Sequence, residues 1–497
     1  GSTDDTASIA SSHGFHVIRT PNRGLSSARN TGLRAATGEI VAYIDDDASP
    51  DPHWLNYLAL AFLDPAGAEI AGVGGPNIPP PGDGLVADCV ARSPGGPVHV
   101  LLSDRRAEHI PGCNMAFRRS ALEAVSGFDP QFRTAGDDVD LCWRLQQAGF
   151  TLRFSPPAVV WHHRRNSIRA YFRQQRGYGS AEAMLERKWP DKYNAVGHLI
   201  WSGRIYSRPL MRLPLGARRI YHGVWGLAPY QSLYERAPNL IESLPLMPEW
   251  YLMIGLLGFL AILRVAWPPL RLASPLLVVA VTAPVVQAVR CADDVSAHDG
   301  YRRGRRRVRA WLLTTILHLV QPYARLCGRL RHGLTLWRRR GTCGCVALVP
   351  KPWTADIWSR RAREIPVRLG EIESALRSRG GSPRRGAAFD RWDLELAGGA
   401  FGASRMSVAV AHHGDGRQLM RVRCWPRISA LAIALALLFG TLSVAAANDG
   451  GGPAWFFLAL IAFWAVLRTA WESSSASAVF LCAITQIHHD EERDEGA

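Results

Sequence analysis

The chain has 497 residues, enough for two or three domains, and its 58 Lys and Arg residues outnumber its 42 Asp and Glu residues. The resulting charge of +16 is concentrated in residues 301–309 and 325–340. Because these basic clusters adjoin long apolar segments, the sequence argues against nucleic acid and favours anionic membrane lipid as the partner of the basic surface.

The first 165 residues or so alternate short apolar runs with amphipathic segments. We expect strands at residues 15–19, 40–44, 72–78 and 150–154, and helices at residues 24–36, 54–63, 120–125 and 139–148. A further helix within residues 167–189 is expected to be followed by a turn at Gly177–Gly179. Such alternation predicts an α/β domain with a mostly parallel sheet.

Three consecutive carboxylates, Asp45, Asp46 and Asp47, follow the apolar run at residues 40–44. Carboxylates at the carboxyl end of a buried strand lie where α/β sheets place their ligands. Asp45 and Asp47 can face the same side of an extended chain, which suits one divalent cation shared with a diphosphate. The alternative is an acidic loop that caps the next helix.

A second pair of carboxylates, Asp137 and Asp138, precedes the helix expected at residues 139–148. The pair either serves as an acid–base group or only caps that helix, where backbone N–H groups favour acids. His162 and His163 follow an apolar strand at residues 158–160. They are either part of a metal shell or ordinary loop residues.

Four apolar segments approach the roughly 20 residues needed to cross a bilayer. They occupy residues 244–267, 272–289, 428–447 and 454–471. The basic block after the second segment predicts a cytoplasmic loop. We therefore expect a multi-pass protein of the inner or plasma membrane whose first domain, residues 1–190, is cytoplasmic.

The segments divide the chain into seven expected parts. A domain at residues 1–190 is followed by a juxtamembrane region (191–243), a transmembrane hairpin (244–290) and a basic interfacial segment (301–341). A small soluble α+β region (342–427), a second transmembrane hairpin (428–471) and a tail (472–497) come after these. Leu312–Val320 reads as a short interfacial helix. In the soluble region we expect strands at residues 392–396 and 406–411, and a turn at residues 413–416.

Several ordered motifs of the first 190 residues resemble family 2 glycosyltransferases of the GT-A fold. They are GSTDDT, NRG, ARNTG, ATGE, IDDD, GCNMAFRR, GFD and GDDVDLCWRL, at residues 1–6, 22–24, 28–32, 36–39, 44–47, 112–119, 127–129 and 136–145. The resemblance implies an inverting transfer of a sugar from a nucleotide-sugar donor to a polysaccharide, glycolipid or other cell-envelope acceptor.

The resemblance also assigns roles to residues around the donor. Asp47 would bind Mg²⁺ or Mn²⁺, with His162 completing the metal shell, while Asp45 and Asp46 would contact the nucleotide sugar. Arg29 would help to hold the nucleotide, unless it is a solvated helix residue.

On the acceptor side, the resemblance makes Asp138 the base and Asp137 an acceptor contact. Asn114 would bond an acceptor hydroxyl, unless its loop is a plain turn. Gln175 and Arg176 lie in a partial match to the QxxRW element of processive synthases. The Trp is missing beside the Arg, which favours addition of single sugars.

The family's chains begin with a β-α-β unit whose second strand ends in a base-reading Asp. This chain opens on the motif that follows it. From the sequence we expect the first β-α-β unit, on the order of 40 residues, to be missing, and donor binding to be weak as a result. The alternative function is a non-catalytic membrane scaffold or degenerate transferase.

Overall fold

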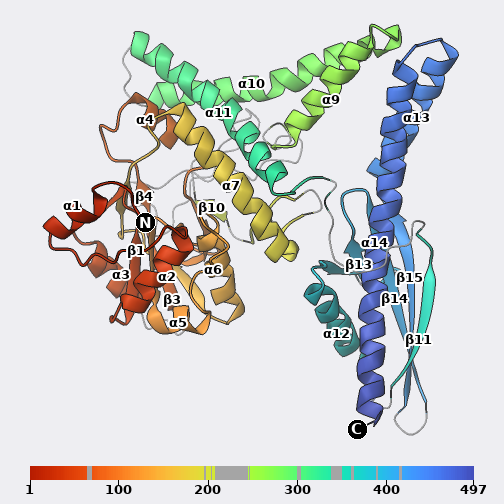
Figure 1. Cartoon of the computed structure of the whole chain (residues 1–497), viewed down its shortest axis with the longest axis horizontal. Coiled ribbons are helices and arrows are strands. Elements are labelled where there is room, and N and C mark those ends of the chain that lie inside the picture. The colour runs from red at the N-terminus through yellow and green to blue at the C-terminus, as the bar shows by residue number, and fades with distance from the viewer. Residues whose placement is uncertain are drawn as a thin grey trace. The chain divides into compact units, whose positions relative to one another are not determined.

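The structure is a computed structural model. It describes residues 1–63, 70–194, 197–202, 204–206, 245, 247–298, 304–336, 338, 350–359, 363–387, 390–413 and 417–496. The chain forms two compact units (Figure 1). The first comprises Gly1–Leu185, Trp201–Leu256 and Leu276–His332, and the second comprises Glu186–Ile200, Leu257–Pro275 and Gly333–Ala497.

The described part of residues 1–188 contains the helices α1 (Thr6–Ser12), α2 (Leu25–Ala35), α3 (Trp54–Phe62), α4 (Leu85–Ala91), α5 (Arg119–Ala124), α6 (Asp137–Gln147) and α7 (Ile168–Lys188), and a short 3₁₀ turn, η1, follows at Pro190–Lys192. The helices expected from the sequence are confirmed. The strand expected at residues 15–19 is wrong, since this segment has no regular secondary structure. Phe15 is 70% exposed, so its side chain gains nothing by joining a sheet.

The main sheet has seven strands in the order β1-β7-β3-β8-β6-β5-β10. These are β1 (Ile40–Ile44), β3 (Ile70–Gly74), β5 (His99–Leu101), β6 (Arg106–His109), β7 (Asn114–Arg118), β8 (Thr151–Phe154) and β10 (Arg204–Tyr206). The expectation of an α/β domain is confirmed, but that of a mostly parallel sheet is wrong, because only β3 and β8 pair in parallel. Residues 99–118 supply three strands with no helix between them, and β7 therefore runs antiparallel to both β1 and β3.

A small second sheet crosses the end of β1. It has the order β2-β9-β4 and consists of β2 (Ala48–Pro50), β9 (Val160–His162) and β4 (Asn77–Ile78). β2 pairs antiparallel with β9, and Ala48 lies opposite His162. This register brings the histidine that ends β9 beside the acidic loop between β1 and β2.

The turn expected at Gly177–Gly179 is wrong, because α7 continues through it. The two helices α7 and α11 (Arg305–Arg331) cross at glycines. A Cβ on Gly179 would lie 2.2 Å from the carbonyl oxygen of Arg325, and one on Gly328 would lie 2.1 Å from that of Arg176. The glycines therefore allow backbone-to-backbone contact where a turn was expected.

Apolar helices follow: α9 (Trp250–Leu263), the 3₁₀ turn η4 (Pro268–Leu272), α10 (Ala273–His298), α13 (Ala430–Asn448) and α14 (Ala454–Gly496). Within the described residues, three stretches are long and apolar enough to cross a membrane, namely Pro268–Asp293, Ala430–Asn448 and Ala454–Glu491. The first of the four expected segments forms only the 14-residue helix α9, which is short for a span.

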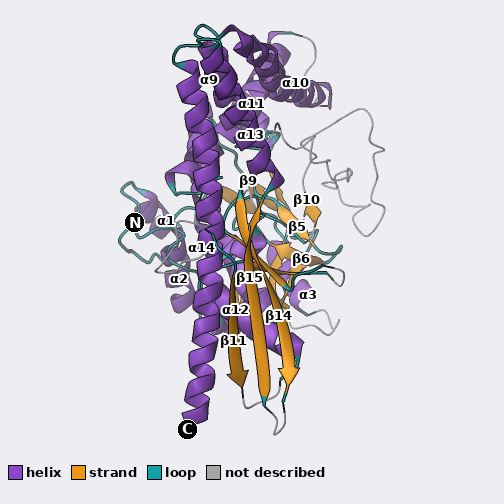
Figure 2. Ribbon diagram, turned by 90° about the vertical axis from the view of Figure 1, so that its right-hand side faces the viewer, coloured by secondary structure: helices purple, strands orange, loops and turns teal. Residues whose placement is uncertain are grey.

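The second unit contains a five-stranded antiparallel sheet, β11-β15-β14-β13-β12. Its strands β11, β15 and β14 are labelled in Figure 2. Its elements are β11 (Trp353–Ser359), α12 (Ile365–Ser378), β12 (Pro383–Arg385), β13 (Leu394–Ala397), β14 (Gly402–His412) and β15 (Gln418–Ile428). Both strands expected in this region are confirmed, whereas residues 414–416 of the expected turn lie outside the described residues.

The C-terminal part of the long helix α14, beyond its most apolar residues, packs on this sheet. Val479, Phe480 and Ile484 are buried against strand residues. The carboxylate of Glu472 accepts hydrogen bonds from the backbone N–H groups of Phe401 and Gly402, at 2.7 and 2.9 Å. Residues 472–496, which were expected to form a C-terminal tail, thus belong to helix α14.

We predict that Gly328→Ala destabilises the first unit, because its methyl group would overlap the Arg176 carbonyl. The overpacking should cost about 1–3 kcal/mol of unfolding free energy, which outweighs the helix propensity of Ala. Gly177→Ala is the matched control, since its Cβ meets nothing within 4 Å. Thermal unfolding of the purified protein measures both, and an unchanged midpoint for Gly328→Ala would refute this packing.

Candidate functional site

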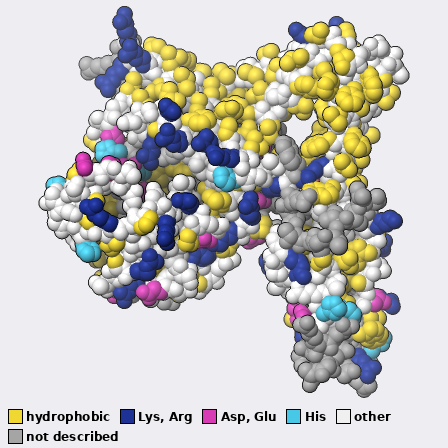
Figure 3. Space-filling view, in the orientation of Figure 1, with side chains coloured by type: hydrophobic (Ala, Val, Ile, Leu, Met, Phe, Trp, Pro, Cys, Tyr) yellow, Lys and Arg dark blue, Asp and Glu magenta, His cyan; other side chains and the backbone are white. Residues whose placement is uncertain are grey.

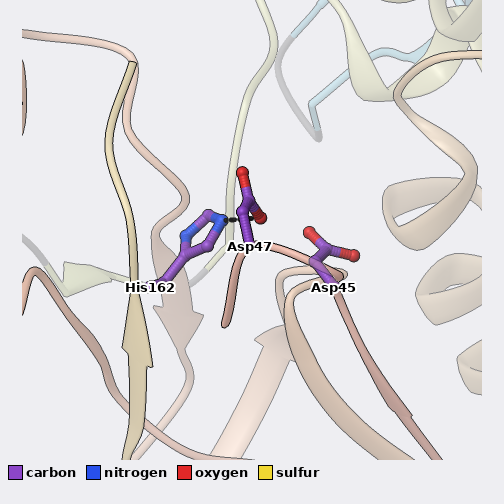
Figure 4. A group of neighbouring side chains, drawn as sticks. All are labelled: Asp45, Asp47 and His162. Carbon is purple, nitrogen blue, oxygen red and sulfur yellow. Dashed lines mark hydrogen bonds and ion pairs between the residues drawn. The ribbon is translucent and has the colours of Figure 1, made fainter. Parts of the chain in front are cut away.

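Three strand ends meet at one edge of the first unit. β1 pairs with β7 so that Ile44 lies opposite Asn114, and Asp45 follows at the end of the strand. Asp47 immediately precedes β2, and His162 ends β9, which pairs with β2. Figure 4 shows the side chains of Asp45, Asp47 and His162 converging from these elements.

The three side chains are placed as metal ligands would be. One candidate ligand atom from each lies within 4.8 Å of the others. Two carboxylates and an imidazole suit Mn²⁺ or Mg²⁺, with the imidazole favouring the transition metal. The residues present therefore fit a divalent cation.

The hydrogen bonds of His162 fix its tautomer. Arg164 donates to Nδ1 at 2.7 Å, so Nε2 carries the proton and donates to the Asp47 carboxylate at 3.0 Å. Ligation through Nε2 requires this proton to leave and Arg164 to give up its contact. The sequence gave no indication of Arg164, whose guanidinium also bonds Asn77.

The two carboxylates differ electrostatically. Burial raises the pKa of Asp45, partly offset by Arg29 and His162. The hydrogen bond from His162 lowers the pKa of Asp47, and Arg165 assists from 3.3 Å.

Two neighbouring residues lie outside this cluster. Asp46 is exposed, and His163 instead bonds Asp83 at 2.6 Å. Of the two histidines, the structure brings only His162 to the carboxylates.

Arg29 joins the two acidic sites. Its guanidinium is 7% exposed and lies 2.6 Å from the Asp137 carboxylate and 3.2 Å from that of Asp45. It also donates to the Gly112 carbonyl at 2.9 Å and packs over the Phe128 ring. A buried, shared Arg of this kind is not a solvated helix residue.

Asp137 and Asp138 begin α6, after Gly136 in the left-handed conformation at φ 87°. Asp137 is buried and turns to Arg29 instead of capping the helix. Asp138 accepts from the Gly112 N–H and the Val139 N–H, each at 2.9 Å. Its side chain is 20% exposed against 2% for Asp137, so Asp138 is the more accessible carboxylate.

Their pKa values move in opposite directions. Burial raises the pKa of Asp137 to about 6, despite its ion pair with Arg29. Burial also opposes ionisation of Asp138, but contacts with His109, Arg29 and the Gly112 N–H outweigh it and lower its pKa to about 2. Asp138 is therefore ionised across the neutral range.

His109 is a site residue that the sequence did not reveal. Its Nδ1 donates to the Val98 carbonyl at 3.1 Å, and its Nε2 lies 3.4 Å from the Asp138 carboxylate. Trp201 stacks on the imidazole at 5.5 Å. His109 ends β6, a strand that no sequence pattern had indicated, so the histidine could not be related to Asp138.

The residues expected on the acceptor side have other partners. Asn114 is fully buried, and its amide bonds Trp54 and the carbonyls of Pro76 and Ala158. Gln175 is also buried, and its side-chain N–H donates to the Gly95 carbonyl, while Arg176 is exposed on α7. Contact with an acceptor does not fit this placement of Asn114 and Gln175, because their polar groups are engaged inside the domain.

Residues 1–126 match the family described as Glycosyl transferase family 2. The N-terminal domain is a family 2 glycosyltransferase domain. Among curated relatives, the domain is similar to the pre-mycofactocin glycosyltransferase of Mycobacterium tuberculosis, with 34% identity over 215 residues, which cover 41% of this chain and 44% of that protein. It also resembles the N-acetylglucosaminyl-diphospho-decaprenol L-rhamnosyltransferase of the same species, with 31% identity over 34% of this chain and 65% of that protein.

The chain thus spans less than half of the first of these relatives. Among solved structures, the glycosyltransferase domain matches a mannosyltransferase from Pyrobaculum calidifontis in complex with GDP-Man and Mn²⁺. That match has 26% identity and a TM-score of 0.28, and it covers 37% of this chain and 52% of that one.

We predict that Asp47→Asn weakens Mn²⁺ binding by at least about tenfold, because it removes a charged oxygen ligand. Asp46→Asn is the matched control, since Asp46 is an exposed neighbour outside the ligand cluster. Electron paramagnetic resonance of free Mn²⁺ measures both affinities. Equal affinities in the two variants would contradict the assignment of Asp47.

Proposed function

We propose that the protein is an inverting, metal-dependent glycosyltransferase that moves a sugar from a nucleotide-sugar donor to a glycan or lipid-linked acceptor. The observation that carries the proposal is the Arg29 bridge, in which one buried guanidinium contacts Asp45 of the Asp45–Asp47–His162 cluster and Asp137 of the Asp137–Asp138 pair. The family match of residues 1–126 supports it.

In this proposal the first cluster is the donor site. A divalent ion held by Asp45, Asp47 and His162 would neutralise the charge that develops on the departing nucleoside diphosphate. Arg29 orients Asp45 rather than reaching the nucleotide itself, since its N–H groups already bond Asp45, Asp137 and Gly112. Arg165, exposed by 46% beside Asp47, is the cation better placed to meet a phosphate.

Asp138 serves as the base. It takes the proton of an acceptor hydroxyl while that oxygen attacks the anomeric carbon and the bond to the diphosphate breaks. Attack from the side opposite the leaving group inverts the anomeric centre. Asp137 holds Arg29, and the backbone N–H groups of Gly112 and Val139 hold the Asp138 carboxylate in place.

The three long apolar helices indicate association with a membrane. We propose an inner or plasma membrane location with the glycosyltransferase domain in the cytoplasm, where nucleotide sugars are made. The support is the arginine cluster at the start of α11, which follows the apolar helix α10. The scaffold alternative is not favoured, because the carboxylates of both sites are arranged for chemistry.

We predict that Asp138→Asn lowers kcat by about 100- to 10,000-fold, the usual contribution of a general base. Donor and Mn²⁺ binding should persist, because the metal cluster is unchanged. Glu123→Gln, an exposed carboxylate of α5, is the control and should retain activity. Sugar transfer is measured with a panel of nucleotide sugars and membrane lipid extract, and normal turnover by Asp138→Asn would refute the role of Asp138.

We also predict an acid limb in the pH profile of kcat/KM. Since the pKa of Asp137 is raised to about 6, this carboxylate takes up a proton as the pH falls through that value, and Arg29 then loses a counter-charge. Asp138 stays ionised there, because its pKa is lowered to about 2. The limb should disappear in Asp137→Asn, whose activity is lower but flat, and a limb that persists would contradict this origin.

A further inference from the structure

Helix α11 exposes a row of apolar side chains and buries several polar ones against the protein. Between Ala310 and Leu330 every exposed residue is apolar, namely Leu312, Ile316, Tyr323 and Leu330. Val308, 58% exposed, extends this row toward the helix start. The spacing of four, four, seven and seven residues from Val308 puts them on one face, which we call the outer row.

The buried residues of α11 are a mixture of polar, small and apolar side chains: Ala310, Thr314, Leu317, His318, Gln321, Pro322, Ala324, Leu326, Gly328 and Arg329. Arg329 forms an ion pair with Glu249 at 2.8 Å, and Arg325 forms one with Glu182 of α7 at 2.8 Å. A helix in water buries its apolar face and exposes its polar one. An exposed row that is wholly apolar, with polar residues such as Gln321 and Arg329 buried behind it, fits a helix whose outer row faces lipid.

α11 is also attached to the apolar helices. Trp311 donates to Asp293 of α10 at 2.7 Å, and Tyr251 of α9 donates to the Leu319 carbonyl at 2.7 Å. Figure 3 shows hydrophobic side chains gathered along the edge formed by α10 and α11, with basic side chains where α11 begins. The outer row therefore continues an apolar surface that contains a candidate membrane span.

The first turn of α11 supplies the charge. Arg305, Arg306, Arg307 and Arg309 are all exposed, and no acidic residue lies in that turn. An apolar row next to a basic turn is the pattern of a helix that lies in the interface of an anionic bilayer.

We infer that α11 lies along the surface of an anionic bilayer, with the outer row among the acyl chains and the four arginines on lipid phosphates. Helix α7 is held next to α11 at the same surface, because Gly179 and Gly328 bring the two backbones into contact. Lipid contact along α11 thereby fixes the first unit on the membrane surface, independently of which reaction the unit catalyses.

The test uses the full chain in vesicles of phosphatidylcholine and phosphatidylglycerol. Benzoylphenylalanine replaces Leu312 or Ile316, and in the control it replaces Leu60, a leucine of α3 that is 63% exposed. After illumination, mass spectrometry identifies the adducts. We expect lipid adducts at the two α11 positions and none at Leu60, with phosphatidylglycerol enriched about fivefold over its share of the vesicle lipid.

Replacement of Arg305, Arg306, Arg307 and Arg309 by Gln should abolish the enrichment while the protein keeps its unfolding temperature. Adducts to a second copy of the chain, or no adducts above the Leu60 level, would overturn the inference and make the outer row a protein interface or a solvent face. Lipid adducts without phosphatidylglycerol enrichment would overturn the role of the arginines.

Discussion

The site depends on one buried cation. The Arg29 guanidinium lies between Asp45 and Asp137, two carboxylates 92 positions apart in the sequence. Without a shared counter-charge, carboxylates brought this close would repel one another and take up protons. By contacting both and the Gly112 carbonyl, Arg29 joins the end of β1, the start of α6 and the loop before β7 into one structure. The donor cluster and the proposed base thus share a single electrostatic support.

Local patterns in the sequence predicted much of this domain. The apolar run at Ile40–Ile44 and the helix at Leu25–Ala35 were predictable because each depends on its own periodicity and flanking residues. The pairing of the strands in the sheet was not predictable from such local patterns. Strand β7, formed by residues 114–118, lies between β1 and β3. The alternation of helices and strands along the sequence does not predict which strand lies between two others. The predicted parallel sheet failed for this reason.

The candidate site shows the same division. Asp45, Asp47 and His162 were expected from the motifs, and the structure brings them together. His109 and Arg164 were not foreseen, because each acts through a partner far along the chain, Asp138 and His162 respectively. Gly177 to Gly179 were interpreted as a turn from composition alone, yet the helix continues through them and Gly179, with Gly328, allows a close helix crossing. Residues whose role depends on tertiary contacts are those that sequence patterns miss.

A double-mutant cycle on Asp45→Asn and Asp137→Asn tests the central claim most directly. If both carboxylates neutralise Arg29, the first substitution leaves one carboxylate bonded to the guanidinium and the second leaves none, so the double variant should lose more unfolding free energy than the sum of the singles. We expect a coupling of about 0.5–3 kcal/mol, as for residues in one ion-pair network. Additive effects of the two substitutions would show that Arg29 does not join the two sites.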